Sequence, residues 1–573
     1  GKLEDALHTL EEYTQLTEKI ADDRADSAVE DFRVRYETKE KEDKLIHEQE
    51  MSKVRLVVVI CLSVFSLLLC VLLALSYRML RIRRRQAKIL TKNQEVKNKL
   101  LSLVPAISDN TESEKLKEIV DNIETMEDVP KMTSRELEVV KLCCEGLTSK
   151  EIAGKLNVSV RTIDTHKSNI FKKLSISSTL ELVKYAVKAG IYMAGGVPIE
   201  ISTIGVCDGI AMNHDGMHYS LVSRETIADS FEIAMHGHQF DAAVCIPNCD
   251  KIVPGMILGA LRVNVPTVFV SGGPMLPGHQ RGRNDGPTTD LNSLFDGVGK
   301  VQAGTMSEED LSYLENSACP TCGSCSGMFT ANSMNCLCEA LGIALPGNGT
   351  IPAVYSERLR LAKHAGMKVM ELLEKGVCIK DIITPAAIHN AMECDMAFGG
   401  STNTVLHLTA IAMEAGCPIT MDDWDAASAR TPHLVKLQPS GPRPLIDLYA
   451  VGGVPVVMHE LAELGLLDAS ALTCMGLIPE YLERCGRPAD GEVVRTHDNP
   501  FSKVGALRVL HGNIAPDGGI VKKAAVDPSM MTHTGPARCF DSEEEACDAI
   551  FGGKINPGDV VVIRYEGPAG GPG

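Results

Sequence analysis

Apolar and polar positions follow different patterns in successive parts of the chain, and each pattern predicts a different structure. Residues 1–52 are highly charged, with leucines that recur loosely, which is typical of a coiled coil or of the end of a helical repeat array. A solvated helix fits the same pattern. Residues 78–128 are predicted to form a polar helical connector, interrupted at Pro105.

The segment from Leu56 to Leu75 is a run of twenty residues without a charge. At a rise of about 1.5 Å per residue, such a helix covers the ~30 Å hydrocarbon core of a bilayer. A cluster of basic residues begins directly afterwards at Arg78, so the positive-inside rule places the residues after 78 in the cytoplasm. We therefore predict a transmembrane helix over 56–75, with a buried core helix as the alternative.

Residues 131–193 have the pattern of a compact helical module. A short helix is predicted at Ser149–Leu156, a turn at 157–159 and a further helix at Arg161–Leu174. Two short helices joined by a tight turn are typical of a helix-turn-helix, although a generic helical bundle is the alternative. The polar face of the second helix carries Arg161, Thr162, Thr165, His166, Lys167 and Lys172.

Charge separates this module from the rest of the chain. The whole chain has a net charge of -18, which argues against nucleic-acid binding by the protein as a whole. Residues 131–193 nevertheless contain eleven Lys or Arg against six Asp or Glu. This local excess of positive charge favours duplex DNA as the partner of the module.

From Ala194 onward, helical periodicity gives way to short apolar runs separated by Gly and Pro. This alternation predicts an α/β domain with a largely parallel sheet over 194–490. The predicted strands are Ile201–Val206, Ala242–Ile246 and Thr267–Val270, and the predicted helices include Arg224–Met235, Ile257–Leu261 and Ala331–Leu341. Residues 491–573 are richer in predicted strands and suggest the beginning of a barrel-like second domain.

Two cysteine-containing stretches carry the candidate chemistry. Cys249, Asp250 and Lys251 follow a predicted buried strand, and side chains that alternate in direction there could serve two adjacent metal centres. A buried Cys beside a surface Asp-Lys pair is the alternative. In the second stretch, Cys319, Cys322 and Cys325 are each three residues apart in a Gly-rich loop, which suits zinc or an iron–sulfur cluster.

Together these stretches resemble the signature regions of the dihydroxy-acid dehydratases, in a family that also includes phosphogluconate and sugar-acid dehydratases. The resemblance runs from about residue 194 to the last residue. Further matching segments are Gly205–Met212, Ser271–Met275, Leu345–Gly349 and Gly399–Asn403. The module at 131–193 closely resembles the LuxR-type DNA-binding domain.

The resemblance implies a site and a reaction. Cys249 and Cys325 would ligate an iron–sulfur cluster, of the 2Fe–2S or 4Fe–4S type, while Asp208, Asp250 and a carbamylated Lys251 would bind Mg²⁺. The reaction would convert a 2,3-dihydroxy-3-methyl acid to a 2-keto acid and water in valine and isoleucine synthesis. The enzyme would be a cytoplasmic homodimer. Cys319 and Cys322 are expected to be bystanders, and Cys207 receives no role.

The resemblance is truncated at both ends. A cluster cysteine found in many members would lie upstream of residue 194, and a Glu metal ligand and the serine base would follow Gly573. We therefore expect the 573-residue chain to turn over little or no substrate. The abrupt change at Ala194 favours a joined reading of two genes, with a natural regulatory fusion as the alternative, and amplification across codons 185–205 distinguishes them.

Overall fold

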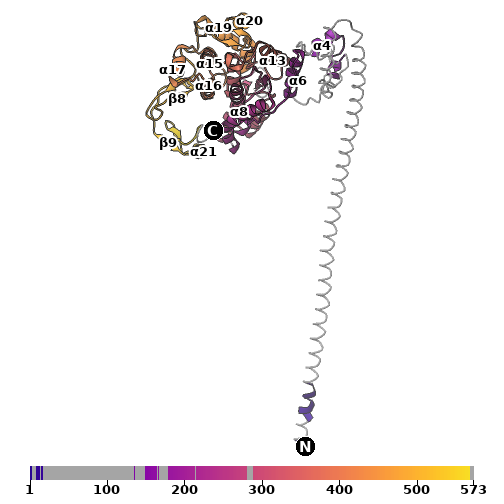
Figure 1. Cartoon of the computed structure of the whole chain (residues 1–573). Helices are drawn as coiled ribbons and strands as arrows, with labels where there is room; N and C mark the ends of the chain where they lie inside the picture. Colours follow the sequence, from indigo (N-terminus) through magenta and orange to yellow (C-terminus); the bar gives the residue numbers. More distant parts are fainter. Residues whose placement is uncertain are drawn as a thin grey trace, which may run out of the picture. The chain divides into compact units, whose positions relative to one another are not determined.

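The computed structural model describes residues 1–2, 8–12, 14–16, 135, 149–159, 161–163, 165–166, 179–212, 214–279 and 288–567 (Figure 1). The chain divides into two units, residues 1–129 and 130–573, and each is described on its own. In the first unit, residues 8–12 and 14–16 are helical. The predicted transmembrane helix at 56–75 and the connector at 78–128 lie outside the described residues.

In the part of the chain that the structure describes, no single helix is both long enough and apolar enough to cross a membrane. Two helices, α18 (Leu445–Val451) and α19 (Val454–Glu463), are long and apolar enough only when they are taken together across a 65° bend. The residues from Val454 to Met458 are buried. Packing in the protein core therefore accounts for the apolar composition of this pair.

The predicted helix-turn-helix segment is described in part. Helix α4 spans Ser149–Leu156, and Asn157 follows with a φ of 51°, a left-handed conformation that asparagine tolerates at a helix end. Residues 161–163 and 165–166 are helical. The Ser159 hydroxyl accepts a hydrogen bond from the Thr162 backbone N–H at 3.1 Å, as a helix N-cap does. The predicted short helix and turn are confirmed here.

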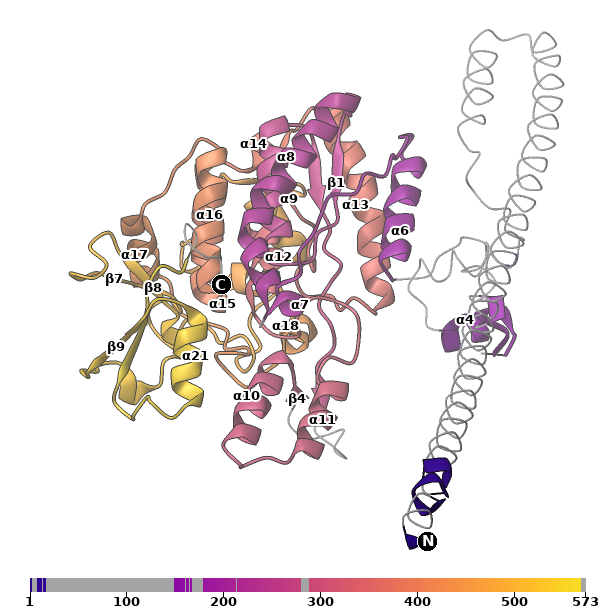
Figure 2. The same ribbon diagram turned by 90° about the horizontal axis from the view of Figure 1, so that it is seen from below.

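The remaining elements of the second unit alternate between many helices and a few short strands (Figures 1 and 2). The helices are α6 (Thr179–Met193), α7 (Asp208–Ala211), η3 (Asp215–Tyr219), α8 (Ser220–His238), α9 (Ile252–Val263), α10 (Leu291–Gln302), α11 (Glu308–Ser317), α12 (Thr330–Ala340), α13 (Ser356–Lys375), α14 (Ile379–Ile382), α15 (Pro385–Phe398), α16 (Thr402–Glu414), α17 (Met421–Arg430), α20 (Ile478–Cys485), η4 (Lys523–Ala525), η5 (Pro528–Met530) and α21 (Glu543–Phe551). The strands are β1 (Ala243–Cys245), β2 (Thr267–Phe269), β3 (Gly278–His279), β4 (Thr288–Thr289), β5 (Leu472–Thr473), β6 (Gly476–Leu477), β7 (Arg508–Leu510), β8 (Gly519–Val521), β9 (Ala537–Phe540) and β10 (Val560–Ile563).

The parallel sheet is smaller than the sequence predicts. Strands β1 and β2 pair in parallel, with Cys245 opposite Phe269, and a single parallel bridge joins Phe269 to Ala344. The predicted strand at 201–206 is absent, which corrects the prediction. Ile201 and Ile204 are 43% and 53% exposed, so this apolar run does not supply the core with a buried strand.

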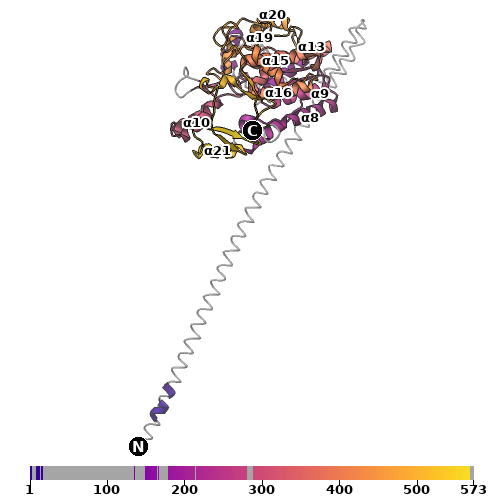
Figure 3. The ribbon, with the colours of Figure 1, turned by 90° about the vertical axis from the view of Figure 1, so that its left-hand side faces the viewer.

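Two helices lie at the centre of the core. Every residue of α12 is buried, and most residues of α15 are. Helices α9, α16 and α19 pack against α12, and Figure 3 shows α8, α9 and α16 close together on one side of the unit. Helix α15 begins with the Thr384 cap and Pro385 and ends at Gly399, whose φ of 72° turns the chain into the following loop.

Helix α6 lies against α13 with very close contact of their backbones (Figure 2). A Cβ atom on Gly190 would collide with the Lys363 carbonyl oxygen, and one on Gly366 would collide with the Val187 carbonyl oxygen. Val183 and Val187 of α6 are buried in the core of the unit. The absence of a side chain at both glycines is therefore what allows the two helices to approach.

The segment after residue 491 gathers around β7 to β10 and α21, away from α6 and α13 (Figure 2). Strands β7 and β8 form an antiparallel pair, and β9 and β10 form a separate parallel pair connected through α21. Each sheet has two strands among the described residues. The arrangement gives no support to the expected barrel-like domain.

We expect Gly366→Ala to destabilise the protein by about 1–3 kcal/mol, because the added methyl group must push two helix backbones apart. Gly237, near the end of α8, is the matched control, since a Cβ there meets nothing within 4 Å. Gly237→Ala should be neutral or stabilising by up to about 1 kcal/mol. Urea unfolding midpoints of the two variants provide the measurement, and equal midpoints would contradict the close contact.

Candidate active site

Strand β1 and helix α9 deliver the first candidate stretch. The strand ends at Cys245, the chain continues through Cys249 and Asp250, and Lys251 is the N-cap residue of α9. The apolar run in β1 fixes the start of this segment in the core, and the following helix fixes its end. The predicted arrangement, a strand that carries polar groups at its C-terminal end, is confirmed.

A buried group of charges forms around Lys251. Its Nζ atom lies 2.5 Å from Oδ2 of Asp208 and 3.7 Å from Oδ2 of Asp250. Lys251 and Asp208 are each 4% exposed. The Ser220 hydroxyl donates to Oδ1 of Asp208 at 2.6 Å, so both carboxylate oxygens of Asp208 are occupied. Segments far apart in the sequence thus bring two carboxylates and one amine together.

The surroundings of Asp250 disfavour the negative charge of its carboxylate. Burial, followed by the negative charge of Asp208, raises the pKa of Asp250 to about 7, while Lys251 and a hydrogen bond with Thr330 act in the opposite direction. A divalent cation between the two carboxylates would relieve their repulsion. Asp250 therefore has the electrostatic surroundings of a cation ligand.

Two thiols lie next to these charges. The Cys207 thiol hydrogen-bonds the Cys249 thiol, and accepting this bond holds the pKa of Cys207 below its ordinary value. Cys325 is half-buried and interacts electrostatically with Asp250 and Cys207. Burial raises the pKa of Cys325 to about 12. The structure therefore brings the predicted cluster residues Cys249 and Cys325 to the same region and adds Cys207, for which no role was predicted.

The loop that holds Cys325 is organised by Asn332. Its amide donates to the carbonyl oxygens of Cys325 and Gly327, and its own oxygen accepts from the Ser324 hydroxyl at 2.7 Å. Gly323 has a φ of 133°, and a Cβ there would collide with the Met275 backbone. The loop is thus shaped by the fully buried amide of Asn332 and by Gly323, a position that no residue with a side chain could occupy without a collision.

A second set of asparagines links the Cys249 segment to its neighbours. Asn248 donates to the Gly273 carbonyl oxygen at 3.1 Å and accepts from Asn335 at 3.3 Å. Asn348 donates to the Asn335 carbonyl oxygen at 2.9 Å and accepts from the Ser271 N–H at 2.7 Å. These side chains replace the backbone ladder that a wider sheet would have provided.

The sequence did not single out Thr330 or His407, yet both lie at the site. Thr330 bonds Asp250, and its hydroxyl is 2.8 Å from that of Ser401. Nδ1 of His407 is 3.3 Å from the guanidinium of Arg224. Burial, together with the charges of Arg224 and Lys251, lowers the pKa of His407 to about 3, so the imidazole is neutral. Thr330 belongs to a segment that matched the family pattern and His407 does not, and polarity alone did not distinguish either position.

As the side chains stand, the described residues contain no group of three or more His, Cys, Asp or Glu arranged around a single metal ion. The Lys251 ammonium group bonds to the carboxylates that would bind a cation. The donor types nevertheless fit two centres, since thiols suit iron and carboxylates suit Mg²⁺. The Ser326 hydroxyl, next to Cys325, is buried without a partner among the described residues, as a donor toward an additional group would be.

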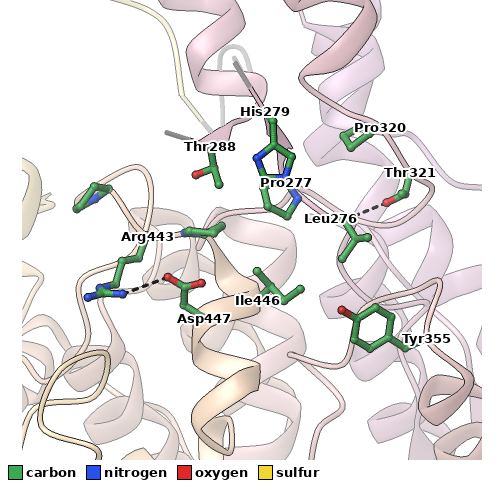
Figure 4. A pocket seen from close by; sticks show the side chains of 12 residues that line it. Leu276, Pro277, His279, Thr288, Pro320, Thr321, Tyr355, Arg443, Ile446 and Asp447 are labelled. Atoms are coloured by element: carbon green, nitrogen blue, oxygen red, sulfur yellow. Dashed lines mark hydrogen bonds and ion pairs between the residues drawn. The ribbon is translucent and has the colours of Figure 1, made fainter. Parts of the chain in front are cut away.

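A pocket of about 640 Å³ lies between the segments that carry Leu276, Thr321 and Arg443 (Figure 4). Arg443 and Asp447 pair at 3.4 Å on its wall, and the Thr321 hydroxyl accepts from the Leu276 N–H at 2.9 Å. It is lined by Leu276, Pro277, His279, Thr288, Pro320, Thr321, Tyr355, Pro442, Arg443, Pro444, Ile446 and Asp447. None of the predicted metal ligands lines it, although the loop that contains Thr321 continues to Cys325.

The predicted DNA-binding residues are partly described. Arg161 and Thr165 are exposed, Thr162 and His166 are half-buried, and Ile163 between them is fully buried. An exposed polar face and a buried apolar face therefore coexist in this segment, as expected for a helix that packs on one side only. Lys167 and Lys172 lie outside the described residues.

Comparison with known proteins adds the decisive observation. Residues 169–479 match the model of the dihydroxy-acid/6-phosphogluconate dehydratase N-terminal domain, and residues 492–573 match that of the C-terminal domain. The chain belongs to the dihydroxy-acid/6-phosphogluconate dehydratase family. Residues 130–186 also match the model of the bacterial regulatory proteins of the luxR family. The matches overlap over 169–186, which includes the first half of α6.

Curated proteins similar to this chain are named as members of the same family. The chain is 58% identical over 395 residues to dihydroxy-acid dehydratase from Carboxydothermus hydrogenoformans, and the match covers 69% of this chain and 70% of the relative. It is 57% identical over 394 residues to the enzyme of the same name from Caldanaerobacter subterraneus, with coverage of 69% and 70%. It is 58% identical over 395 residues to dihydroxy-acid dehydratase from Ruminiclostridium cellulolyticum, and this match covers 69% of this chain and 71% of the relative.

We expect Asn332→Ala to destabilise the protein by about 1–3 kcal/mol, because two carbonyl oxygens and one hydroxyl in the interior lose their partner. The Cys325 thiol should also react faster with iodoacetamide. Asn316→Ala is the control, since the Asn316 amide makes one exposed bond to Ser312. Thermal midpoints and alkylation rates measure both effects, and an Asn332 variant that behaves like the control would contradict this role.

Proposed function

We propose that the dehydratase part of the chain removes water from a 2,3-dihydroxy-3-methyl acid to give a 2-keto acid, a step of valine and isoleucine biosynthesis. The observation that carries this proposal is the convergence of Asp208, Asp250 and Lys251 beside Cys249, in a chain 57–58% identical to dihydroxy-acid dehydratases. A sugar-acid or phosphogluconate dehydratase is the alternative within the family.

The reaction requires loss of a weakly acidic proton from C2 and of hydroxide from C3. When bound, Mg²⁺ and an iron–sulfur cluster supply Lewis acidity for the substrate oxygens. Asp208 and Asp250 would hold Mg²⁺, and Cys249 and Cys325 would hold the cluster. Placing the oxygen donors and the thiols in one region allows a single small substrate to contact both centres.

Lys251 decides whether the carboxylates can hold a cation. As an ammonium group it pairs with Asp208 and Asp250 and would repel Mg²⁺. Carbamylation adds CO2 to the lysine nitrogen with loss of two protons from the ammonium group, so anionic oxygen replaces the positive charge, both carboxylates are released and a third oxygen donor is gained.

Binding of 2,3-dihydroxy-3-methylbutanoate to the reconstituted full chain, measured by calorimetry with and without Mg²⁺, tests the proposal. Binding should depend on Mg²⁺, and Asp250→Asn should weaken it at least about tenfold, since loss of even an outer-shell partner costs about 10–100-fold. Asp296→Asn, an exposed position on α10, is the control. Tighter binding of gluconate would favour the sugar-acid alternative, and equal binding by both variants would overturn the site.

A second function, duplex DNA binding, is favoured for residues 131–193 by the luxR family match. Arg161 and Thr165 present polar groups on an exposed helix face, with Ile163 buried behind them. We propose that this face, with Thr162, His166, Lys167 and Lys172, meets the major groove or phosphates. We also propose that residues 56–75 anchor the chain in a membrane and that the residues after 78 lie in the cytoplasm. The enzyme part is proposed to form a homodimer.

DNA binding should weaken steeply as salt rises, because phosphate contacts release counterions. We expect Arg161→Ala to lower affinity by about 1–3 kcal/mol if the side chain contacts a base, or to reduce the salt slope by about 1 if it contacts a phosphate. Lys300→Ala, which removes an exposed charge from α10, is the control. Fluorescence anisotropy over a salt series measures both, and identical behaviour of the two variants would exclude this face.

A further inference from the structure

The two predicted thiol ligands, Cys249 and Cys325, do not complete the ligand set of an iron–sulfur cluster. Iron–sulfur clusters commonly have four outer positions for protein ligands, most often thiolates. If one iron remains open to the substrate, three positions remain for the protein. Cys249 and Cys325 fill two of them, so a third ligand must come from elsewhere in the chain.

The structure brings one further thiol into contact with this pair. Cys207 hydrogen-bonds Cys249 through their side chains and interacts electrostatically with Cys325. Cys207 is the N-cap residue of α7, where its carbonyl oxygen accepts the Ile210 N–H at 3.1 Å and its thiol makes no cap bond. The helix therefore holds the backbone of Cys207 and does not occupy its thiol.

The position of Cys207 follows from that of its neighbour. Asp208 is fixed by Ser220 and by Lys251, and Cys207 precedes it as an extended residue at the start of α7. Cys249 precedes Asp250 in the same way. Two Cys-Asp pairs from separate segments therefore each contribute one thiol and one carboxylate, with the thiols together and the carboxylates together.

Other thiols fit this role less well. Cys245 and Cys338 are buried in the aliphatic core. Cys319 is within electrostatic reach of Cys325, but its other interacting group is Asp290.

We infer that Cys207 is the third protein ligand of the iron–sulfur cluster in this chain, in addition to Cys249 and Cys325. The inference rests on the proposed dehydratase function. Each of the three thiols gives up its proton when it binds iron, and the remaining outer position stays open for the substrate oxygen. The ligand set is thereby complete without a cysteine from the region upstream of residue 194.

The test uses the full chain, reconstituted anaerobically in detergent with ferrous iron and sulfide. Iron and sulfide content, visible absorption and the rate of iron loss to a chelator are compared for wild type, Cys207→Ala and Cys319→Ala. Cys319 is the matched control because it is also an exposed thiol near Cys325. We expect Cys207→Ala to lose iron at least about tenfold faster, and Cys319→Ala to behave like wild type.

Alkylation of the wild type gives a second readout that needs no variant. Loading the cluster should protect Cys207 from iodoacetamide, as located by peptide mass spectrometry, and leave Cys319 reactive. If wild type holds a cluster while Cys207→Ala keeps it equally well, or if Cys207 remains reactive in the loaded protein, the inference is wrong and the proposed function stands. If the wild type takes up no cluster, both the inference about Cys207 and the proposed function are wrong.

Discussion

Three charged side chains buried side by side impose the strongest constraint on this protein. Lys251 pairs with Asp208 and Asp250 in a region almost closed to water. Removing one partner of such a group typically costs about 3–5 kcal/mol, because the remaining charge is left uncompensated. The segments that carry these residues must therefore keep their positions together, which holds the end of β1, the start of α7 and the N-terminus of α9 in one place.

Amide side chains maintain these positions where secondary structure does not. The sheet at the site consists of β1, β2 and one bridge, so most of the loops around it have no strand ladder to join. Asn248, Asn335, Asn348 and Asn332 supply hydrogen bonds between those loops. The Asn248, Asn332 and Asn348 side chains are satisfied on both the oxygen and the nitrogen, and such an amide specifies a single arrangement more strictly than an apolar contact does.

The segment around Cys249 could be predicted from local sequence, whereas Asp208 and the ligand roles were implied only by the family resemblance. The apolar run before Cys249 and the helix after Lys251 follow short-range rules, and both are present in the structure. The contact of Cys207 with Cys249 could not be predicted in this way, since it depends on how two distant segments pack. The error at 201–206 has the opposite origin, because an apolar run indicates a strand only if a partner strand is available, and here its isoleucines are exposed.

The helix pair α6 and α13 has a mechanical consequence. Their backbones touch at Gly190 and Gly366, so α6 cannot rotate or slide without displacing α13, which packs on β1 and β2. Both family matches extend into α6. Any movement of this helix in one module must therefore also disturb the packed core of the other.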